Sequence, residues 1–404
     1  MIYLDNGATT WPKHRAMFAE MVERYMEIGV SPGRGSYDQA VEAQIYISKT
    51  REKLARFFGG ADANRVIFTS NATDALNLAL FGLLQQNSRV VTTRLEHNSV
   101  LRPLYQLQQT LGVKTNYVSF DTLGFVDLEE FEKAIAAVSS ANNKVPNLAI
   151  VSHASNVLGT VQPLARIGDI CRNYGVPLLV DASQSAGHIQ VDMAAMAASA
   201  LVFTGHKSLY APPGIGGLIL QPDLEIKSTR FGGTGIESKS MLHTQAFPER
   251  LEAGTHNLMG IIGLSLAVDD LVRQGLQVIH RQEMVLASKL YRGLQHIPGI
   301  ELYGGATFMG ENDGIKSSLE GCYQLPLFAA NLKGLHPEDL SSILDGDFDI
   351  AVRSGLHCAP LVHETMGTGQ KGAVRFSLGQ FNTEAEIEQT ILAMTHIAER
   401  WIPS

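Results

Sequence analysis

The sequence is poor in cysteine, has no excess of basic residues and lacks long hydrophobic runs. Its 404 residues include three cysteines, Cys171, Cys322 and Cys358, which lie far apart. An odd number of scattered cysteines excludes a disulfide framework and favours a reducing compartment. The chain has 32 Lys and Arg against 40 Asp and Glu, a net charge of −8. Without a basic excess to neutralise phosphates, we expect no nucleic-acid partner.

No apolar run approaches the ~18 residues that a membrane-spanning helix needs. The first ten residues, MIYLDNGATT, lack the basic and apolar stretches of an export signal. We therefore expect a cytoplasmic protein without a membrane partner. The 45% hydrophobic content is enough for a large core.

Short apolar runs alternate with longer amphipathic segments between about residues 65 and 220. Strands are predicted at 66–68, 89–92, 114–119, 148–151, 177–180, 201–203 and 217–220, and helices at 73–84, 99–111 and 164–174. Helices between successive strands predict an α/β fold with a mainly parallel sheet covered on both faces. Strands buried on both faces also explain why the apolar runs do not alternate with polar residues.

The pattern changes beyond about residue 258, where a smaller α+β domain is predicted. Helices are expected at 261–276, 282–294 and 384–401, the last after a capping signal at Asn382-Thr383. Extended segments are expected near 300–302 and 324–327.

Polar residues follow each predicted strand, and the carboxyl ends of parallel strands meet at one edge of a sheet, where ligands bind. These segments are Thr69-Ser70-Asn71-Ala72-Thr73-Asp74, Glu96-His97-Asn98-Ser99, Ser152-His153-Ala154-Ser155-Asn156, Asp181-Ala182-Ser183-Gln184-Ser185 and Thr204-Gly205-His206-Lys207-Ser208. The helix beginning near Thr73 could hold an anion with its free amides, although an ordinary helix cap is the better explanation of that segment taken alone. Five polar strand ends in succession favour a binding site.

Lys207 and Asp181 suggest a particular chemistry. A lysine among apolar and cationic neighbours, here His206, has a lowered pKa, which favours imine formation with an aldehyde. A carboxylate at the end of a buried strand can keep a pyridine nitrogen protonated. Together they indicate pyridoxal 5'-phosphate (PLP), whose ring acts as an electron sink.

Eight short motifs give this sequence a family resemblance. It resembles the class V aminotransferases among fold-type I PLP enzymes, and within them the cysteine desulfurase and selenocysteine lyase branch. The motifs are Tyr3-Leu4-Asp5-Asn6-Gly7-Ala8-Thr9-Thr10, Glu96-His97-Asn98, Asp181-Ala182-Ser183-Gln184-Ser185, Thr204-Gly205-His206-Lys207, Glu252-Ala253-Gly254-Thr255, Arg353-Ser354-Gly355-Leu356-His357-Cys358-Ala359, Val374-Arg375-Phe376-Ser377 and Phe381-Asn382-Thr383. They span almost the whole chain.

The resemblance implies a large PLP-binding domain over residues 16–260, with a seven-stranded sheet. Residues 1–15 and 261–404 would form the small α+β domain that carries the Cys358 loop and Arg375. It also implies a homodimer, a small amino-acid substrate (L-cysteine or L-selenocysteine) and a sulfur-acceptor protein.

The same resemblance implies a role for each matching residue. Lys207 would form the imine with the cofactor and move the Cα proton, Asp181 would pair with the pyridinium nitrogen, His97 would stack on the ring, and Gln184 would bind the ring hydroxyl. The phosphate would be held by Ala72, Thr73, Thr204 and His206, with Thr255 donated by a partner subunit. Asn156 and Arg375 would bind the substrate carboxylate, with Arg353 beside them.

Cys358 is the residue that distinguishes a desulfurase from a transaminase or epimerase of the same family. A cysteine is usually a small buried hydrophobe, which suits Cys171 and Cys322, but Cys358 lies between glycine and proline beside His357 and Arg353. Cationic neighbours favour a reactive thiolate. Such a thiolate could take sulfur from cysteine, leaving alanine and a persulfide.

Other interpretations remain open. His357, Cys358 and His363 offer metal ligands, but without a second cysteine pair we expect no metal site. Gly232-Gly233-Thr234-Gly235 could cradle a phosphate or act as a hinge. Many desulfurases have a second histidine at the position of Leu356, and relatives often have Asn at that of Ser31, so sulfur and selenium are not distinguished. A class V transaminase or epimerase would need no thiol, and a non-catalytic scaffold would lack Lys207 or Asp181.

Overall fold

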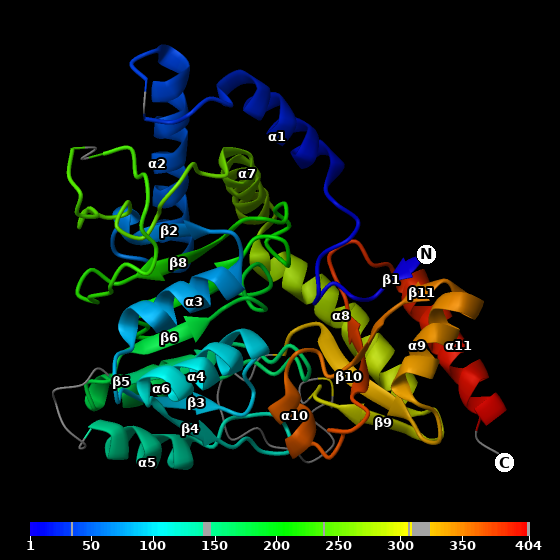
Figure 1. Cartoon of the computed structure of the whole chain (residues 1–404). Coiled ribbons are helices and arrows are strands. Elements are labelled where there is room, and N and C mark those ends of the chain that lie inside the picture. Colours follow the sequence, from blue (N-terminus) through cyan, green and yellow to red (C-terminus); the bar gives the residue numbers. More distant parts are fainter. Residues whose placement is uncertain (34, 140–146, 237–238, 306–307, 309–323, 402–404) are drawn as a thin grey trace.

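A seven-stranded sheet ordered β2-β8-β7-β6-β5-β3-β4 is the central sheet of the larger part of the protein, on the left in Figure 1. The computed structural model describes residues 1–33, 35–139, 147–236, 239–305, 308 and 324–401. The strands are β2 (Val66–Thr69), β3 (Arg89–Thr93), β4 (Lys114–Val118), β5 (Asn147–Ser152), β6 (Leu178–Asp181), β7 (Ala200–Thr204) and β8 (Gly216–Leu220). β8 is antiparallel to both neighbours, and the other pairs of this sheet are parallel. The predicted mainly parallel sheet is confirmed.

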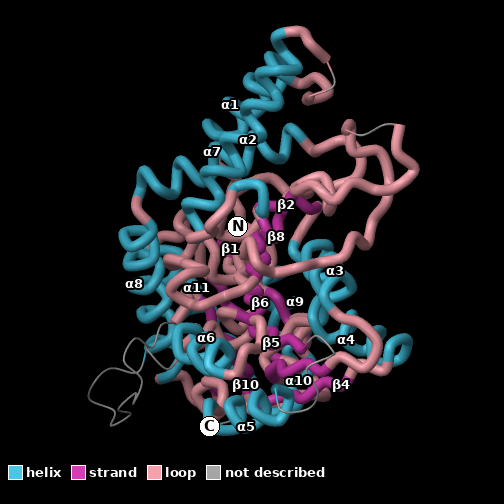
Figure 2. The backbone as a smooth tube through the Cα atoms, turned by 90° about the vertical axis from the view of Figure 1, so that its left-hand side faces the viewer, coloured by secondary structure: helices cyan, strands magenta, loops and turns pink. Residues whose placement is uncertain are grey.

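Helices cover both faces of this sheet, with α3 and α4 on one side and α6 on the other (Figure 2). The helices of this part are α1 (Arg15–Ile28), α2 (Asp38–Phe58), the short 3₁₀ helix η1 (Ala63–Arg65), α3 (Ala72–Leu83), α4 (Asn98–Leu111), α5 (Leu128–Ser139), α6 (Leu164–Asn173) and α7 (Leu258–Gln274). The predicted helices at 73–84, 99–111 and 164–174 therefore correspond to α3, α4 and α6.

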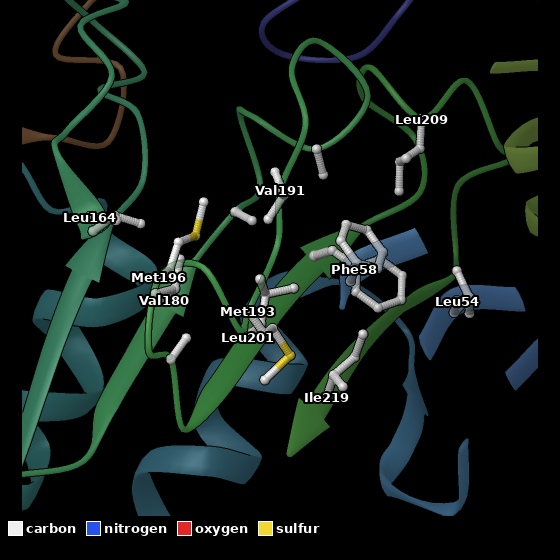
Figure 3. Packing of buried hydrophobic residues seen from close by; sticks show 14 of the residues in the cluster. Leu54, Phe58, Leu164, Val180, Val191, Met193, Met196, Leu201, Leu209 and Ile219 are labelled. Carbon is white, nitrogen blue, oxygen red and sulfur yellow. The ribbon is translucent and has the colours of Figure 1, made fainter. Parts of the chain in front are cut away.

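Successive strand residues contribute to two different cores. In β6, Leu178 and Val180 belong to the core under α2, α6 and α7, whereas Leu179 belongs to the core under α3 and α4. Figure 3 shows Val180, Leu201 and Ile219, from three adjacent strands, on the same side as Leu54 and Phe58 of α2. Burial on both faces confirms the prediction made from the non-alternating apolar runs.

The remaining residues form a second layered unit around its own core. A four-stranded sheet, ordered β12-β13-β10-β9, and a two-stranded sheet, β1-β11, lie against helices. The elements are β1 (Ile2–Tyr3), α8 (Leu276–Gln295), β9 (Ile300–Tyr303), β10 (Leu327–Leu332), α9 (Pro337–Phe348), β11 (Ile350–Ala351), β12 (Arg353–Gly355), α10 (Pro360–Thr365), β13 (Ala373–Ser377) and α11 (Glu384–Trp401).

Two expected elements are displaced. The segment predicted at 324–327 is extended from Leu327 onward as β10, because Pro326 has no N–H to donate to a ladder. The helix predicted at 261–276 ends at Gln274, where Gly275 adopts φ 84°. The next helix therefore begins at Leu276 instead of residue 282.

The predicted domain boundary at residue 260 stays a prediction, and the packing favours one further along the chain. Buried residues of α7, such as Leu264 and Leu271, pack into the core that α2 covers, whereas Ala287 and Leu290 of α8 belong to the second core. We propose a junction within α8. Ile2 and Leu4 contribute to the second core, which supports grouping residues 1–15 with it.

None of the helices in the described part of the chain has both the length and the apolar character needed to span a membrane.

Candidate active site

A cavity of about 530 Å³ opens at the carboxyl ends of the central strands. Every site residue predicted from the sequence lines this cavity except Thr255: these are Ala72, Thr73, His97, Asn156, Asp181, Gln184, Thr204, His206, Lys207, Arg353, Cys358 and Arg375. Loops after β2, β3, β5, β6 and β7 supply the sheet-side residues, as expected for parallel strands that end at one edge. The small unit adds β12, β13 and the Cys358 loop.

Asp181 is the last residue of β6 and is almost fully buried. Its Oδ1 accepts hydrogen bonds from the backbone N–H of Ser183, at 2.9 Å, and from the Ser183 hydroxyl. Oδ2 has no hydrogen-bond partner among the described residues. A carboxylate with one oxygen fixed and the other available at the cavity wall suits a cationic ring nitrogen.

Lys207 follows β7, and its pKa is lowered to about 8. Burial is the main cause; Asp181 opposes the shift, while Arg375 and Arg353 add to it. The predicted direction of the shift is thus confirmed, but the cationic neighbours are the two arginines. His206 does not supply the charge, because burial lowers its own pKa to about 4 and leaves its ring neutral near pH 7.

The N-terminus of α3 forms the end of the cavity near Thr204. Asn71 caps the helix by accepting from the Asp74 N–H, so the amides of Ala72 and Thr73 lie ahead of the first helical hydrogen bonds. The Thr73 hydroxyl is 2.8 Å from that of Ser99. Thr204 Oγ1 is buried and has no hydrogen-bond partner among the described residues. Free amides and an unpartnered hydroxyl fit a phosphate group.

His97 caps α4: its Nδ1 accepts from the Ser99 N–H at 3.0 Å and lies 2.8 Å from the Ser99 hydroxyl. Burial and the nearby Lys207 lower its pKa to about 4. The ring is therefore neutral near pH 7, with its proton on Nε2. A neutral, fixed imidazole at the wall is suited to stacking against an aromatic ring.

Arg375, on β13, is buried and is one of two arginines that line the cavity. Nη2 donates to Asp5 Oδ1 at 2.6 Å, and Nη1 donates to the carbonyl of Asn156 at 3.1 Å. Nε is buried and has no partner in the part of the chain that the structure describes. The Asn156 amide in turn donates to the His357 carbonyl at 2.6 Å. Arg353 lies opposite Arg375 on β12 and is exposed at the cavity mouth.

Cys358 lies in a loop of unusual backbone conformation. Gly355, His357 and Cys358 all have positive φ values, of 105°, 49° and 54°. Left-handed conformations at non-glycine residues cost free energy and cluster at functional sites. The His357 and Cys358 carbonyls accept hydrogen bonds from the Asn156 side chain and the Asn98 N–H, each at 2.6 Å. The loop is thus tied to the first turn of α4 and to the loop after β5.

The charge around Cys358 differs from the expectation. Burial and Arg375 lower the pKa of His357 to about 3, so the cation beside the loop is Arg353 and not His357. His357 Nδ1 lies 3.4 Å from His363 Nε2, and His357 Nε2 lies 3.2 Å from the Arg353 carbonyl. These nitrogens are thus engaged in hydrogen bonds, and no group of three or more metal-ligating side chains gathers in the described ranges.

Thr255 lies in a separate cavity of about 380 Å³, together with Ser31, Gly33 and Thr234. Gly254 donates to the Gly233 carbonyl at 2.9 Å, so the glycine-rich segment supports this turn and does not line the cavity of Lys207. The donation of Thr255 to a partner subunit stays a prediction.

Cys171 is buried in α6, as expected, and Cys322 lies outside the described residues.

Sequence reasoning assigned no role to several residues of the site. Gly7 and Ala8 line the cavity from the N-terminal segment, and Asp5 pairs with Arg375. Glu96 is fully buried, bonds Thr93 and Ser152, and has a pKa raised to about 7 by burial. The N-terminal motif and the strand-end pattern contained these residues, but neither reveals such contacts.

Comparisons with known proteins identify the family of this chain. A family model described as "Aminotransferase class-V" matches residues 2–390. The chain belongs to the class V aminotransferase family. A protein of Methanothermobacter thermautotrophicus named "Probable cysteine desulfurase" is 33% identical, over 96% of this chain and 92% of that protein. The "Cysteine desulfurase" of Salmonella agona is 30% identical, over 98% and 93%.

A solved structure is also similar over nearly the full length. The apo structure of the cysteine desulfurase from Thermococcus onnurineus NA1 is 32% identical, with a TM-score of 0.88, covering 99% of this chain and 95% of that one. The predicted fold-type I class is therefore confirmed.

Proposed function

We propose that this chain is a PLP-dependent cysteine desulfurase that converts L-cysteine to L-alanine and holds the sulfur as a persulfide on Cys358. The observation that carries the proposal is that Cys358 lines the same cavity as Lys207 and Arg375. The relatives named cysteine desulfurase support it. A transaminase or epimerase needs no thiol there, so the position of Cys358 favours sulfur chemistry.

The residues of the cavity fit the cofactor at both of its ends. The amides of Ala72 and Thr73 and the unpartnered Thr204 hydroxyl suit its phosphate, and Asp181 Oδ2 suits its ring nitrogen. The lowered pKa of Lys207 increases the fraction of free amine that can bind the aldehyde. When bound, PLP withdraws electrons from the substrate's Cα. His97 would cover the ring and Gln184 would approach its hydroxyl.

The protein's own groups would carry the other steps. Arg375, with Asn156 and Arg353, would bind the substrate carboxylate, and Lys207 Nζ would take and return a proton. The Cys358 sulfur would bond to the substrate sulfur as the C–S bond breaks. The bonding pair would stay with Cβ, which then takes a proton to give alanine. Two thiols thus become one persulfide without an external oxidant.

Cys358 also lines a second cavity, of about 420 Å³, with His97, Ser99, Arg102 and Phe81. Because the thiol borders both spaces, sulfur accepted on one side could leave on the other to an acceptor protein. We further propose a homodimer in which Thr255 completes the phosphate site of the partner.

A pair of cysteine variants tests the proposal. Cys358→Ser should retain PLP absorbance but release no sulfide from L-cysteine, while alanine formation falls with it. Cys171→Ser, at a buried position in α6 away from the cavity, is the matched control and should keep activity. Full sulfide release by Cys358→Ser would contradict the persulfide mechanism. Faster turnover of L-selenocysteine than of L-cysteine by the unmodified protein would favour a selenocysteine lyase.

A further inference from the structure

The first turn of α4 joins three parts of the cavity through successive residues. His97 caps this helix and contributes its ring to the cavity wall, and the Asn98 N–H donates to the Cys358 carbonyl at 2.6 Å. The Ser99 hydroxyl lies 2.8 Å from the hydroxyl of Thr73, on α3, and Ser99 also lines the cavity. Ser99 therefore connects the His97 imidazole with the N-terminus of α3, the end of the cavity that suits a phosphate.

The hydrogen bonds at His97 set the direction of this chain of contacts. Nδ1 of His97 accepts from the Ser99 backbone N–H at 3.0 Å, so this nitrogen carries no proton. The Ser99 hydroxyl lies 2.8 Å from the same nitrogen and must therefore donate to it. Because a hydroxyl has one proton, Ser99 Oγ can only accept from the Thr73 hydroxyl. The order of donation is thus Thr73 to Ser99 to His97.

This order has a consequence at each end of the chain of contacts. The Thr73 hydroxyl donates its proton to Ser99, so Thr73 offers a phosphate its backbone amide in this arrangement. At the other end, His97 Nδ1 receives two donors, which restrict the orientation of the ring and stabilise its neutral form. Burial and Lys207 favour the same neutral form by lowering the pKa of His97 to about 4.

The Ser99 hydroxyl contributes more than the start of a helix requires. The Ser99 backbone N–H alone completes the cap that His97 provides to α4. The hydroxyl is a second donor to the same nitrogen, and its other partner, Thr73, lies 26 positions away on a different helix. An alanine in place of Ser99 would keep the cap and lose the hydroxyl contacts, so the two contributions can be separated.

We propose that Ser99 is a positioning residue that holds the neutral His97 imidazole in place against the cofactor ring and joins it to the phosphate end of the cavity. The inference rests on the proposed function and goes beyond it by adding a residue that acts through His97. The substrate carboxylate is assigned to other residues, Arg375 and Asn156. Loss of the Ser99 hydroxyl should therefore slow turnover without weakening substrate binding.

The test follows the nitrogen NMR signal of His97 Nδ1 in the cofactor-free protein near pH 7, identified by its loss in His97→Gln. In Ser99→Ala this nitrogen loses one of its two donors, so its signal should move downfield. Ser99→Thr restores a hydroxyl and should return the signal to the wild-type position. Thr73→Val removes only the donor to Ser99 and should leave the signal nearly unchanged. Ser342→Ala, which removes an exposed hydroxyl of α9, is the matched control and should have no effect.

Turnover of the PLP-loaded protein gives a second readout. Ser99→Ala should lower kcat for alanine formation about fivefold, the size of one lost hydrogen bond, at an unchanged KM. The inference is overturned if the Nδ1 signal is the same in Ser99→Ala and in the wild type, or if Thr73→Val shifts it as far as Ser99→Ala does. If the wild type binds no PLP, the proposed function fails, while the signals of the cofactor-free protein still decide the role of Ser99.

Discussion

The sheet edge and the Cys358 loop form one cavity, but they are built differently. At the sheet edge, Asp181 ends one strand buried on both faces and Lys207 follows another, and Ser183 fixes Asp181. The loop instead has three positive φ values and is held by hydrogen bonds to neighbouring loops. The comparison indicates that binding groups come from regular structure, whereas the reactive sulfur is placed by strained backbone.

Removing the amine at the sheet edge should have the largest effect. In Lys207→Ala, no group in the cavity can bind the cofactor aldehyde covalently, and alanine formation should fall by about a thousandfold or more. Absorbance after reconstitution and alanine production check this. Retention of both would show that the sheet edge is not the binding region.

Backbone strain in the loop can be separated from its function by two glycine variants. Gly355 and Gly334 both have positive φ, of 105° and 84°, and an added Cβ meets nothing within 4 Å at either. Gly355→Ala and Gly334→Ala should therefore each lower the free energy of unfolding by about 1–2 kcal/mol. Urea denaturation measures that change.

The Gly355→Ala and Gly334→Ala variants should differ in activity. Gly355 precedes Cys358 by three residues, so its variant should form persulfide about tenfold more slowly while binding PLP normally. Gly334, between β10 and α9, should leave persulfide formation unchanged. Equal activity of the two variants would mean that strain in the loop does not position the thiol.

The pH dependence of cofactor uptake probes the amine at the sheet edge. Because the pKa of Lys207 is about 8, the fraction of free amine rises with pH and levels off above that value. The rate of PLP uptake by the cofactor-free protein should rise about tenfold between pH 7 and pH 9. Stopped-flow absorbance measures it. In Arg353→Gln the midpoint should move to higher pH, since Arg353 lowers this pKa; an unmoved midpoint would contradict the assignment.

The smallest effect on activity is expected from substitution of Cys171, the second cysteine among the described residues. Burial raises the pKa of Cys171 to about 12, so its thiol is unreactive near pH 7. Cys171→Ser buries a hydroxyl and should lower the free energy of unfolding by about 1–2 kcal/mol with no loss of sulfide release. Thermal unfolding and the sulfide assay check both statements.

The sheet, its covering helices and the gathering of strand-end residues could be predicted, because hydrophobic periodicity and parallel-strand geometry are local or general properties. The end of α7 at Gln274 was missed, since only the φ of Gly275 distinguishes a break from a continuous helix. The pairing of Asp5 with Arg375 joins residues 370 positions apart and leaves no local pattern. The charge state of His357 could not be predicted either. Its place beside Cys358 in the sequence suggests a cationic neighbour, but burial lowers its pKa and leaves the ring neutral.

The most direct test of the account is mass spectrometry of the PLP-loaded protein after brief exposure to L-cysteine without an acceptor. We predict a gain of one sulfur atom on the peptide that contains Cys358, reversed by a thiol reductant and matched by an equal amount of alanine. Alanine formed with no added sulfur on that peptide, or sulfur found on the Cys171 peptide instead, would contradict it.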